Sequence, residues 1–158
     1  MSEYFLDASA LVKRYVAEPG SNWTKQITDF EAKNTILIAE ITLAEVAAAL
    51  AAKHRATAGL NKEQRDRALS RFLQDCNEHF VLLTIDRDII DQAVELTQNY
   101  RLRGYDAVQL ARSLSGNETL IKQGLSGLIF TASDKDLLAA AKAENLSTDN
   151  PLNHTDLD

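Results

Sequence analysis

The chain has 158 residues, of which 45% are hydrophobic and 25% charged, a globular composition long enough for one domain with a sizeable core. Its 17 basic and 23 acidic residues give a net charge of −6, which disfavours general affinity for nucleic acid, since that affinity depends on Lys and Arg neutralising phosphates. The single cysteine, Cys76, excludes an internal disulfide framework. We find no signal-peptide pattern and no apolar run of the roughly 20 residues that a membrane span needs, so we expect a cytoplasmic protein.

Short apolar runs alternate along the chain with longer amphipathic stretches. We predict strands at residues 4–6, 35–38, 80–85 and 128–131, all of them buried by composition. Helices are expected at about 9–16, 21–30, 42–56, 61–75, 86–96, 106–114 and 135–144. Strands that alternate with helices pair in parallel through right-handed crossovers, which predicts a three-layer α/β domain. We assign this domain to residues 1–146 and expect residues 147–158 to form a polar, loosely held tail.

Four acidic residues occupy equivalent places in this pattern. Asp7 and Asp134 directly follow the first and last strands, Glu45 lies in the first turn of the helix after the second strand, and Asp106 opens a helix. Strand ends and the following helix starts lie along one edge of a parallel sheet, so the four side chains could meet. Carboxylates gathered in one place repel one another, and such a cluster is typical of a hard cation such as Mg²⁺.

Each of these acids also has a purely structural explanation. Asp7 and Asp134 could cap helices, and Glu45 could complete a capping box with Thr42. Asp106 could cap its own helix, with Gln109 reaching back in the same manner. The residues alone therefore leave both interpretations open.

Other catalytic chemistries fit the sequence poorly. The three histidines, His54, His79 and His154, are far apart and form no zinc-binding pair. No nucleophile elbow, phosphate-binding P-loop or dinucleotide-binding glycine pattern is present. Cys76 and Trp23 are interpreted as packing residues.

The segments that hold the four acids resemble the PIN-domain family, and within it the VapC-type toxin ribonucleases of bacterial toxin–antitoxin pairs. The most specific segment is YFLDASALVKRYVAEPGS, at residues 4–21; the others are ITLAEVAAAL at 41–50, LRGYDAVQLA at 102–111 and FTASDKDLLAAA at 130–141. The resemblance spans residues 4 to about 146. It implies a parallel sheet of four or five strands flanked by helices, a pocket that binds Mg²⁺ or Mn²⁺, and cleavage of RNA.

Carried over position by position, the resemblance makes Asp7, Glu45, Asp106 and Asp134 the catalytic, metal-binding acids. Asp7 and Asp106 would be direct or water-bridged ligands, Asp134 would complete the set, and Glu45 would hold a second ion or orient the attacking water. Asp136 is the alternative for the fourth acid.

Two other residues are expected to support this pocket. Ser9 matches the small hydroxyl residue that follows the first acid, and Arg103 is the best candidate for a phosphate contact. The other basic residues near the acids are Lys13, Arg14, Arg101 and Lys135. The alternative interpretation is that they are ordinary solvated surface residues.

The resemblance also implies partners, namely an RNA substrate, an inhibitory antitoxin and a second copy in a homodimer. Trp23, Phe72 and Leu73 are candidates for interface contacts or for core packing.

Three alternatives remain for the function. The chain could be a PIN fold that binds RNA or protein without cutting, or a nuclease that acts on DNA. A phosphatase of the haloacid-dehalogenase type is disfavoured, because it would need an aspartate where Ser9 stands.

Overall fold

A five-stranded parallel sheet forms the centre of the molecule. The computed structural model describes all residues from 1 to 158, and the strands lie in the order β3–β2–β1–β4–β5. The four predicted strands appear as β1 (Glu3–Leu6), β2 (Thr35–Ala39), β3 (Val81–Leu83) and β4 (Leu128–Thr131), and β5 (Ser147–Asp149) adds a fifth. The predicted three-layer α/β architecture with a parallel sheet is confirmed.

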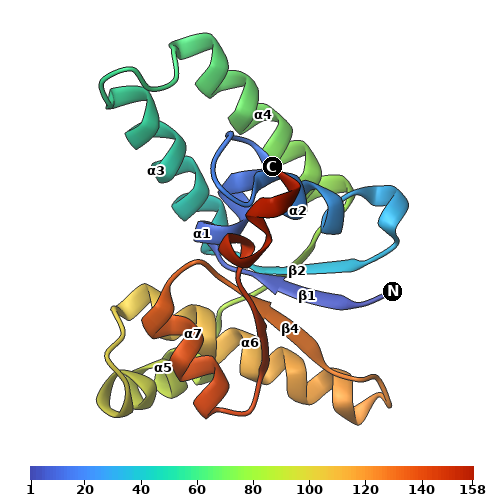
Figure 1. Cartoon of the computed structure of the whole chain (residues 1–158). Helices are drawn as coiled ribbons and strands as arrows, with labels where there is room; N and C mark the ends of the chain where they lie inside the picture. The colour runs from blue at the N-terminus through green and yellow to red at the C-terminus, as the bar shows by residue number, and fades with distance from the viewer.

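Helices cover both faces of the sheet (Figure 1). One side carries α1 (Ala8–Leu11), α2 (Ser21–Ile27), α3 (Thr42–Arg55) and α4 (Lys62–Glu78), and the other carries α5 (Arg87–Asn99), α6 (Gly104–Lys122) and α7 (Lys135–Ala143). Three 3₁₀ turns complete the chain, η1 (Val12–Arg14), η2 (Phe30–Ala32) and η3 (Pro151–Leu157). Several predicted helix starts are capped, and α4 begins with a full capping box between Asn61 and Gln64.

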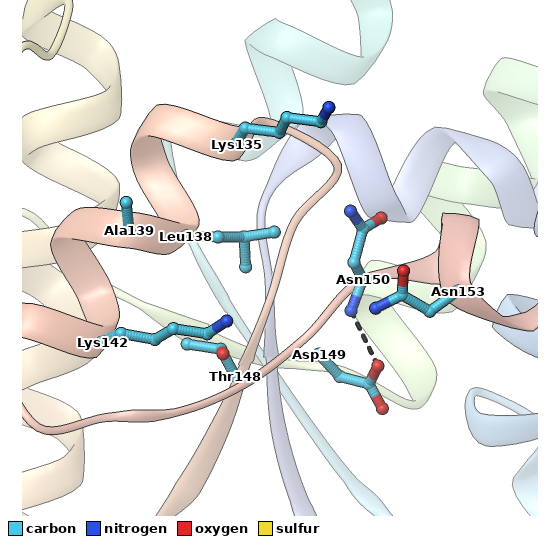
Figure 2. A pocket seen from close by; sticks show the side chains of 8 residues that line it. All are labelled: Lys135, Leu138, Ala139, Lys142, Thr148, Asp149, Asn150 and Asn153. Atoms are coloured by element: carbon cyan, nitrogen blue, oxygen red, sulfur yellow. Dashed lines mark hydrogen bonds between the residues drawn. The ribbon is translucent and has the colours of Figure 1, made fainter.

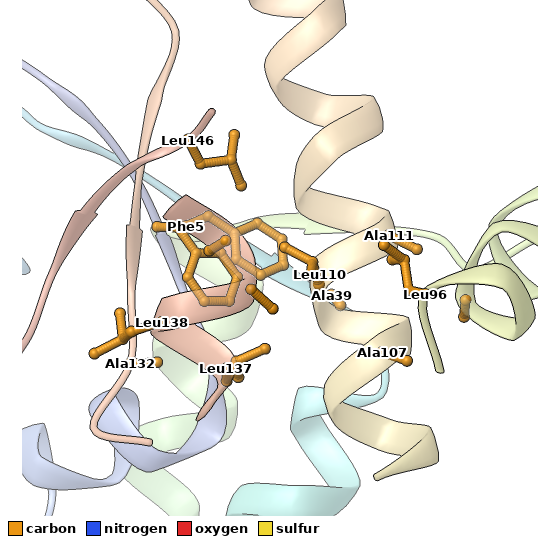
Figure 3. Close-up of a cluster of buried hydrophobic side chains, with 14 of the residues drawn as sticks. Phe5, Ala39, Leu96, Ala107, Leu110, Ala111, Ala132, Leu137, Leu138 and Leu146 are labelled. Atoms are coloured by element: carbon orange, nitrogen blue, oxygen red, sulfur yellow. The ribbon is translucent and has the colours of Figure 1, made fainter. Parts of the chain in front are cut away.

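Alternate residues of the strands point into two separate cores. Phe5 of β1 stacks on Phe130 of β4, with ring centroids 5.7 Å apart, in the core under α5, α6 and α7 (Figure 3). Leu6, the next residue, is fully buried in the core under α1, α3 and α4. Strands buried on both faces read as continuous apolar runs, which explains why the sequence identifies β1, β2 and β4 so clearly.

β3 differs from its prediction as a buried strand. It covers only Val81–Leu83 of the expected residues 80–85, and Val81 and Leu82 are 44% and 38% exposed. β3 pairs with β2 alone and forms one edge of the sheet, so an apolar composition here does not imply full burial.

The expectation of a loosely held tail at residues 147–158 was wrong. Ser147–Asp149 forms β5, which pairs with β4 and closes the other edge of the sheet. The η3 turn then packs on α2, where the ring of His154 stacks on Trp23 at 4.3 Å. The side chain of the last residue, Asp158, accepts hydrogen bonds from the backbone N–H groups of Gly20 and Asn22. A polar sequence is compatible with order here because these polar groups have partners within the fold.

Two of the residues considered as interface contacts lie in the interior. Phe72 is fully buried among the residues of the α3–α4 core, and Trp23 is 7% exposed. Leu73 alone of the three remains 40% exposed. The packing interpretation therefore holds for Trp23 and Phe72, and it holds for the buried Cys76 as well. None of the helices is long and apolar enough to cross a membrane.

Candidate active site

Asp7 lies at the carboxyl end of β1, in the middle of the sheet. Its side chain accepts hydrogen bonds from the Ser9 hydroxyl at 2.7 Å and from the Ala10 N–H at 3.0 Å. The residue is only 6% exposed. Burial raises the pKa of Asp7 to about 7; the two hydrogen bonds oppose this shift, and the charges of Glu45 and Asp106 add to it.

Ser9 connects Asp7 to the neighbouring strand. Its hydroxyl oxygen accepts a hydrogen bond of 2.9 Å from the backbone N–H of Ser133, directly after the end of β4. Ser9 thus fixes both the Asp7 carboxylate and the loop that leads to Asp134. The hydroxyl of Ser133 is buried without a hydrogen-bond partner.

Glu45 projects from the first turn of α3 toward α6. Its carboxylate accepts a hydrogen bond of 2.7 Å from the side-chain amide of Gln109, which also donates to the Thr42 hydroxyl at 2.8 Å. Gln109 is 1% exposed, and its own amide oxygen has no partner. Burial raises the pKa of Glu45, Gln109 lowers it, and the charge of Asp106 raises it further.

Asp106 and Asp134 lie at one pocket of about 430 Å³. We call this pocket the acidic cleft; the charged residues that line it are Arg101, Arg103, Asp106, Asp134 and Asp136. Burial and the charge of Asp134 raise the pKa of Asp106, while a hydrogen bond from the Arg103 backbone and the charge of the Arg103 guanidinium, whose Nε lies 3.9 Å from the Asp106 carboxylate, lower it. Asp134 caps α7 by accepting from the Leu137 N–H, whereas Asp136 lies exposed within the helix.

The four predicted acids are thus coupled electrostatically along one edge of the sheet. The charges of Glu45 and Asp106 raise the pKa of Asp7. The charge of Asp106 raises the pKa of Glu45, and the charge of Asp134 raises the pKa of Asp106. No group of three such side chains lies close enough together to hold a metal ion directly in the arrangement that the structure shows. The donors nevertheless suit Mg²⁺, which prefers carboxylate oxygens, keeps several waters and commonly uses one or two direct carboxylates.

Helix capping does not account for all four acids. Asp7 and Asp134 do cap α1 and α7. The capping box predicted for Thr42 and Glu45 is absent, because both side chains accept from Gln109 instead. Asp106 does not open its helix either: α6 begins at Gly104, and no side chain caps it. Glu45 therefore carries charge toward this edge without a capping role, whereas the Asp106 carboxylate accepts a hydrogen bond from the backbone N–H of Arg103 at the start of α6.

The nearby basic residues divide into two groups. Lys13 is buried and pairs with Glu18 at 3.1 Å, and Arg14 pairs with Asp75 at 2.9 Å, so both serve the packing of the domain. Arg101 and Arg103 line the acidic cleft and are exposed.

The sequence matches the family model described as PIN domain over residues 4–143. The chain belongs to the PIN-domain family. The match includes all four acids at the positions described above. No curated protein matches the sequence with significance.

Solved structures share this fold at low sequence identity. VapBC2 from Rickettsia felis, bound to a DNA fragment from its promoter, superposes with a TM-score of 0.62 at 18% identity and covers 94% of this chain and 98% of its own. VapC20 of Mycobacterium tuberculosis, described as a Sarcin-Ricin loop cleaving toxin, superposes with a TM-score of 0.60 at 17% identity and covers 88% of this chain and 95% of its own. FitAB, bound to an IR36 DNA fragment, superposes with a TM-score of 0.60 at 16% identity and covers 94% of this chain and 95% of its own.

Proposed function

We propose that this PIN-domain protein is an endoribonuclease that hydrolyses RNA phosphodiester bonds with the help of Mg²⁺ or Mn²⁺. The observation that supports the proposal best is the coupled row of four acids, in which burial and neighbouring charge raise the pKa of Asp7 to about 7. A charged row of this kind is unfavourable in a purely structural role, and strongly shifted groups of this sort gather at functional sites.

Asp7, Glu45, Asp106 and Asp134 would hold the metal ion. A bound divalent cation lowers the pKa of a coordinated water and neutralises charge on a phosphoryl group. The protein itself orients the carboxylates: Ser9 and the Ala10 N–H fix Asp7, Gln109 fixes Glu45, and the start of α7 fixes Asp134. Arg103 and Arg101, at the mouth of the acidic cleft, would contact RNA phosphates.

The structural neighbours support an RNA substrate and an antitoxin partner as parts of the proposal. VapC20 is described as a toxin that cleaves the Sarcin-Ricin loop, and VapBC2 is bound to a DNA fragment from its promoter. We extend the proposal to a cytoplasmic toxin that forms a homodimer and is inhibited by a cognate antitoxin. Light scattering tests the homodimer, and a result that shows only monomer at high micromolar concentration would count against it. Inspection of the neighbouring gene tests the antitoxin, and a gene for a short DNA-binding protein there would support it.

RNA cleavage by matched variants tests the proposed activity. Wild type should cut single-stranded RNA with Mg²⁺ and should stop when a chelator is added. Asp106→Asn should reduce cleavage at least a hundredfold, because general acid–base and metal-assisted steps of this kind contribute factors of about that size. Asp88→Asn, which changes an exposed acid in the first turn of α5, should cut RNA like wild type.

Equal cleavage by Asp106→Asn and wild type would remove Asp106 from the mechanism. RNA binding by the wild type without any cleavage, with Mg²⁺ or Mn²⁺, would favour a PIN fold that binds RNA and does not cut it. Cleavage of single-stranded DNA at the same rate as RNA would assign the protein to the DNA-cutting alternative.

A further inference from the structure

A second groove, which carries two lysines, lies between α7 and the C-terminal segment (Figure 2). It has a volume of about 290 Å³ and is formed by α7, β5 and the start of η3. The polar residues that line it are Lys135, Lys142, Thr148, Asp149, Asn150 and Asn153. We call it the α7–β5 groove. Its lining has two lysines against one aspartate, in a protein whose net charge is −6.

Both lysines of the groove lack a partner in the protein. Neither Lys135 nor Lys142 forms an ion pair or a hydrogen bond, and three lysines elsewhere (Lys25, Lys33 and Lys62) are unpaired as well, whereas Lys13, Lys53 and Lys122 are paired with glutamates. The two are seven residues apart and lie on one side of α7, about 10 Å apart along the helix axis at 1.5 Å per residue. Two unpaired ammonium groups on one side of a helix can each neutralise one phosphate of an extended polyanion.

The other polar groups of the groove leave hydrogen-bond donors available. The Asn150 side-chain oxygen accepts from the Leu152 N–H, so its NH₂ group remains free, and the Asn153 side chain has no partner in the protein. One oxygen of the Asp149 carboxylate, Oδ1, accepts from the Asn150 N–H at 2.7 Å and lies 2.8 Å from Nε2 of His154. The groove therefore offers two lysine ammonium groups and side-chain amide donors, which recognise phosphate oxygens, beside the one carboxylate of Asp149.

One end of the groove, at Lys135 and Asn150, lies at the edge of the sheet that holds the four acids. Asp7 ends β1, Asp134 follows β4, and Asn150 follows β5, which is the next strand along. Neighbouring strands are about 5 Å apart, so the groove begins about 10 Å from Asp7. On α7 itself, Asp134 and Asp136 line the acidic cleft, while Lys135 between them lines the groove.

We propose that the α7–β5 groove binds the phosphodiester backbone of the RNA strand beyond the bond that is cut. The inference rests on the proposed function, because it takes RNA as the substrate. Lys135 and Lys142 would each neutralise one phosphate, and Asn150 and Asn153 would donate to phosphate oxygens. The acidic row would thus act on one phosphate while the groove holds the next part of the strand.

The salt dependence of RNA binding tests the groove directly. We would measure the affinity of a fluorescent single-stranded RNA by anisotropy with Mg²⁺, in the Asp106→Asn background so that the RNA stays intact. Adding Lys135→Gln and Lys142→Gln should weaken binding roughly tenfold near physiological salt, and should flatten the slope of log K against log salt by about 1.4, or 0.7 per phosphate contact on single strands.

A matched pair of substitutions controls for net charge. Lys25→Gln with Lys62→Gln changes two exposed, unpaired lysines on α2 and α4, outside both the cleft and the groove. If the groove variant and this control bind RNA with the same affinity and slope, the groove proposal is overturned. RNA cleavage is measured separately, with proteins that retain Asp106. A protein that binds RNA through the groove but never cuts it would contradict only the proposed nuclease activity.

Discussion

At the scale of single residues, Asp7 carries the largest electrostatic cost in the acidic row. Its ordinary pKa of 3.8 rises to about 7 in the folded protein. Between these two values the folded chain binds more protons than the unfolded chain, so the free energy of unfolding must fall as the pH rises. The stabilising contribution of protonated Asp7 is fully present below about pH 4 and is lost as the pH passes through 7.

The corresponding prediction concerns stability in chelator. From pH 4 to pH 7.5 the wild type should lose on the order of 2–4 kcal/mol of stability through Asp7, at about 1.4 kcal/mol per pKa unit. Asp7→Asn, which can still cap α1, should abolish most of this loss and be the more stable protein at pH 7.5. Denaturant unfolding across this range measures it, with the exposed cap variant Asp29→Asn as control. A slope that is the same in wild type and Asp7→Asn would contradict the raised pKa.

Gln109 is the residue that positions Glu45. Gln109→Leu would leave the Thr42 hydroxyl and the Glu45 carboxylate without their donor, in a place where an unpaired polar group costs about 1–3 kcal/mol. We expect a loss of stability of that size, together with a lower kcat for RNA and little change in KM. The exposed Gln26 offers a matched Gln26→Leu control that should change neither. A Gln109→Leu variant with wild-type kcat would show that Glu45 needs no such support.

The four acids could be found from the sequence because each follows a strand or opens a helix, and those places share one edge of a parallel sheet. The role of Gln109 could not be found in this way. Its position in the sequence, three residues after Asp106, indicates a contact within α6, but the side chain reaches across to α3. That contact depends on how the two helices pack, which a local pattern does not contain. The same holds for Arg14, whose partner Asp75 lies 61 residues away.

At the scale of elements, the C-terminal segment stabilises α2 and the edge of the sheet. His154 stacks on Trp23, the only tryptophan of the chain. His154→Ala should cost about 1 kcal/mol, the usual worth of such a ring pair, and should shift the emission of Trp23. Removal of residues 147–158 should lower the melting temperature much further, because it also exposes the edge of β4. Wild-type melting of the truncated protein would show that the segment is dispensable.

β5 escaped prediction because its composition gives no strand signal. Ser147, Thr148 and Asp149 are polar, and only their pairing with β4 makes them a strand. The buried strands β1, β2 and β4 were predictable because both of their faces are apolar. β3 lies between these cases: it was found by composition, but its place at the edge of the sheet, and hence its exposure, follows from the strand order alone.

At the scale of the whole molecule, the charge distribution decides which surface can meet RNA. A net charge of −6 makes the average surface repulsive to phosphates. The exposed basic residues near the acids are Arg101 and Arg103 at the acidic cleft and Lys135 at the near end of the α7–β5 groove, with Lys142 further along the groove. A cation bound among the acids would remove the remaining repulsion, so RNA binding should depend on the metal as well as on these four side chains.

The central claim is that the acidic row binds a divalent cation, and calorimetric titration with Mn²⁺ tests it most directly. At pH 6.5 the wild type should bind Mn²⁺ below millimolar concentration and release protons, since Asp7 must lose its proton when a cation binds beside it. The observed heat should therefore differ between buffers of different ionisation enthalpy. Asp106→Asn should bind at least tenfold more weakly. No detectable binding of Mn²⁺ by the wild type at millimolar concentration would contradict the account.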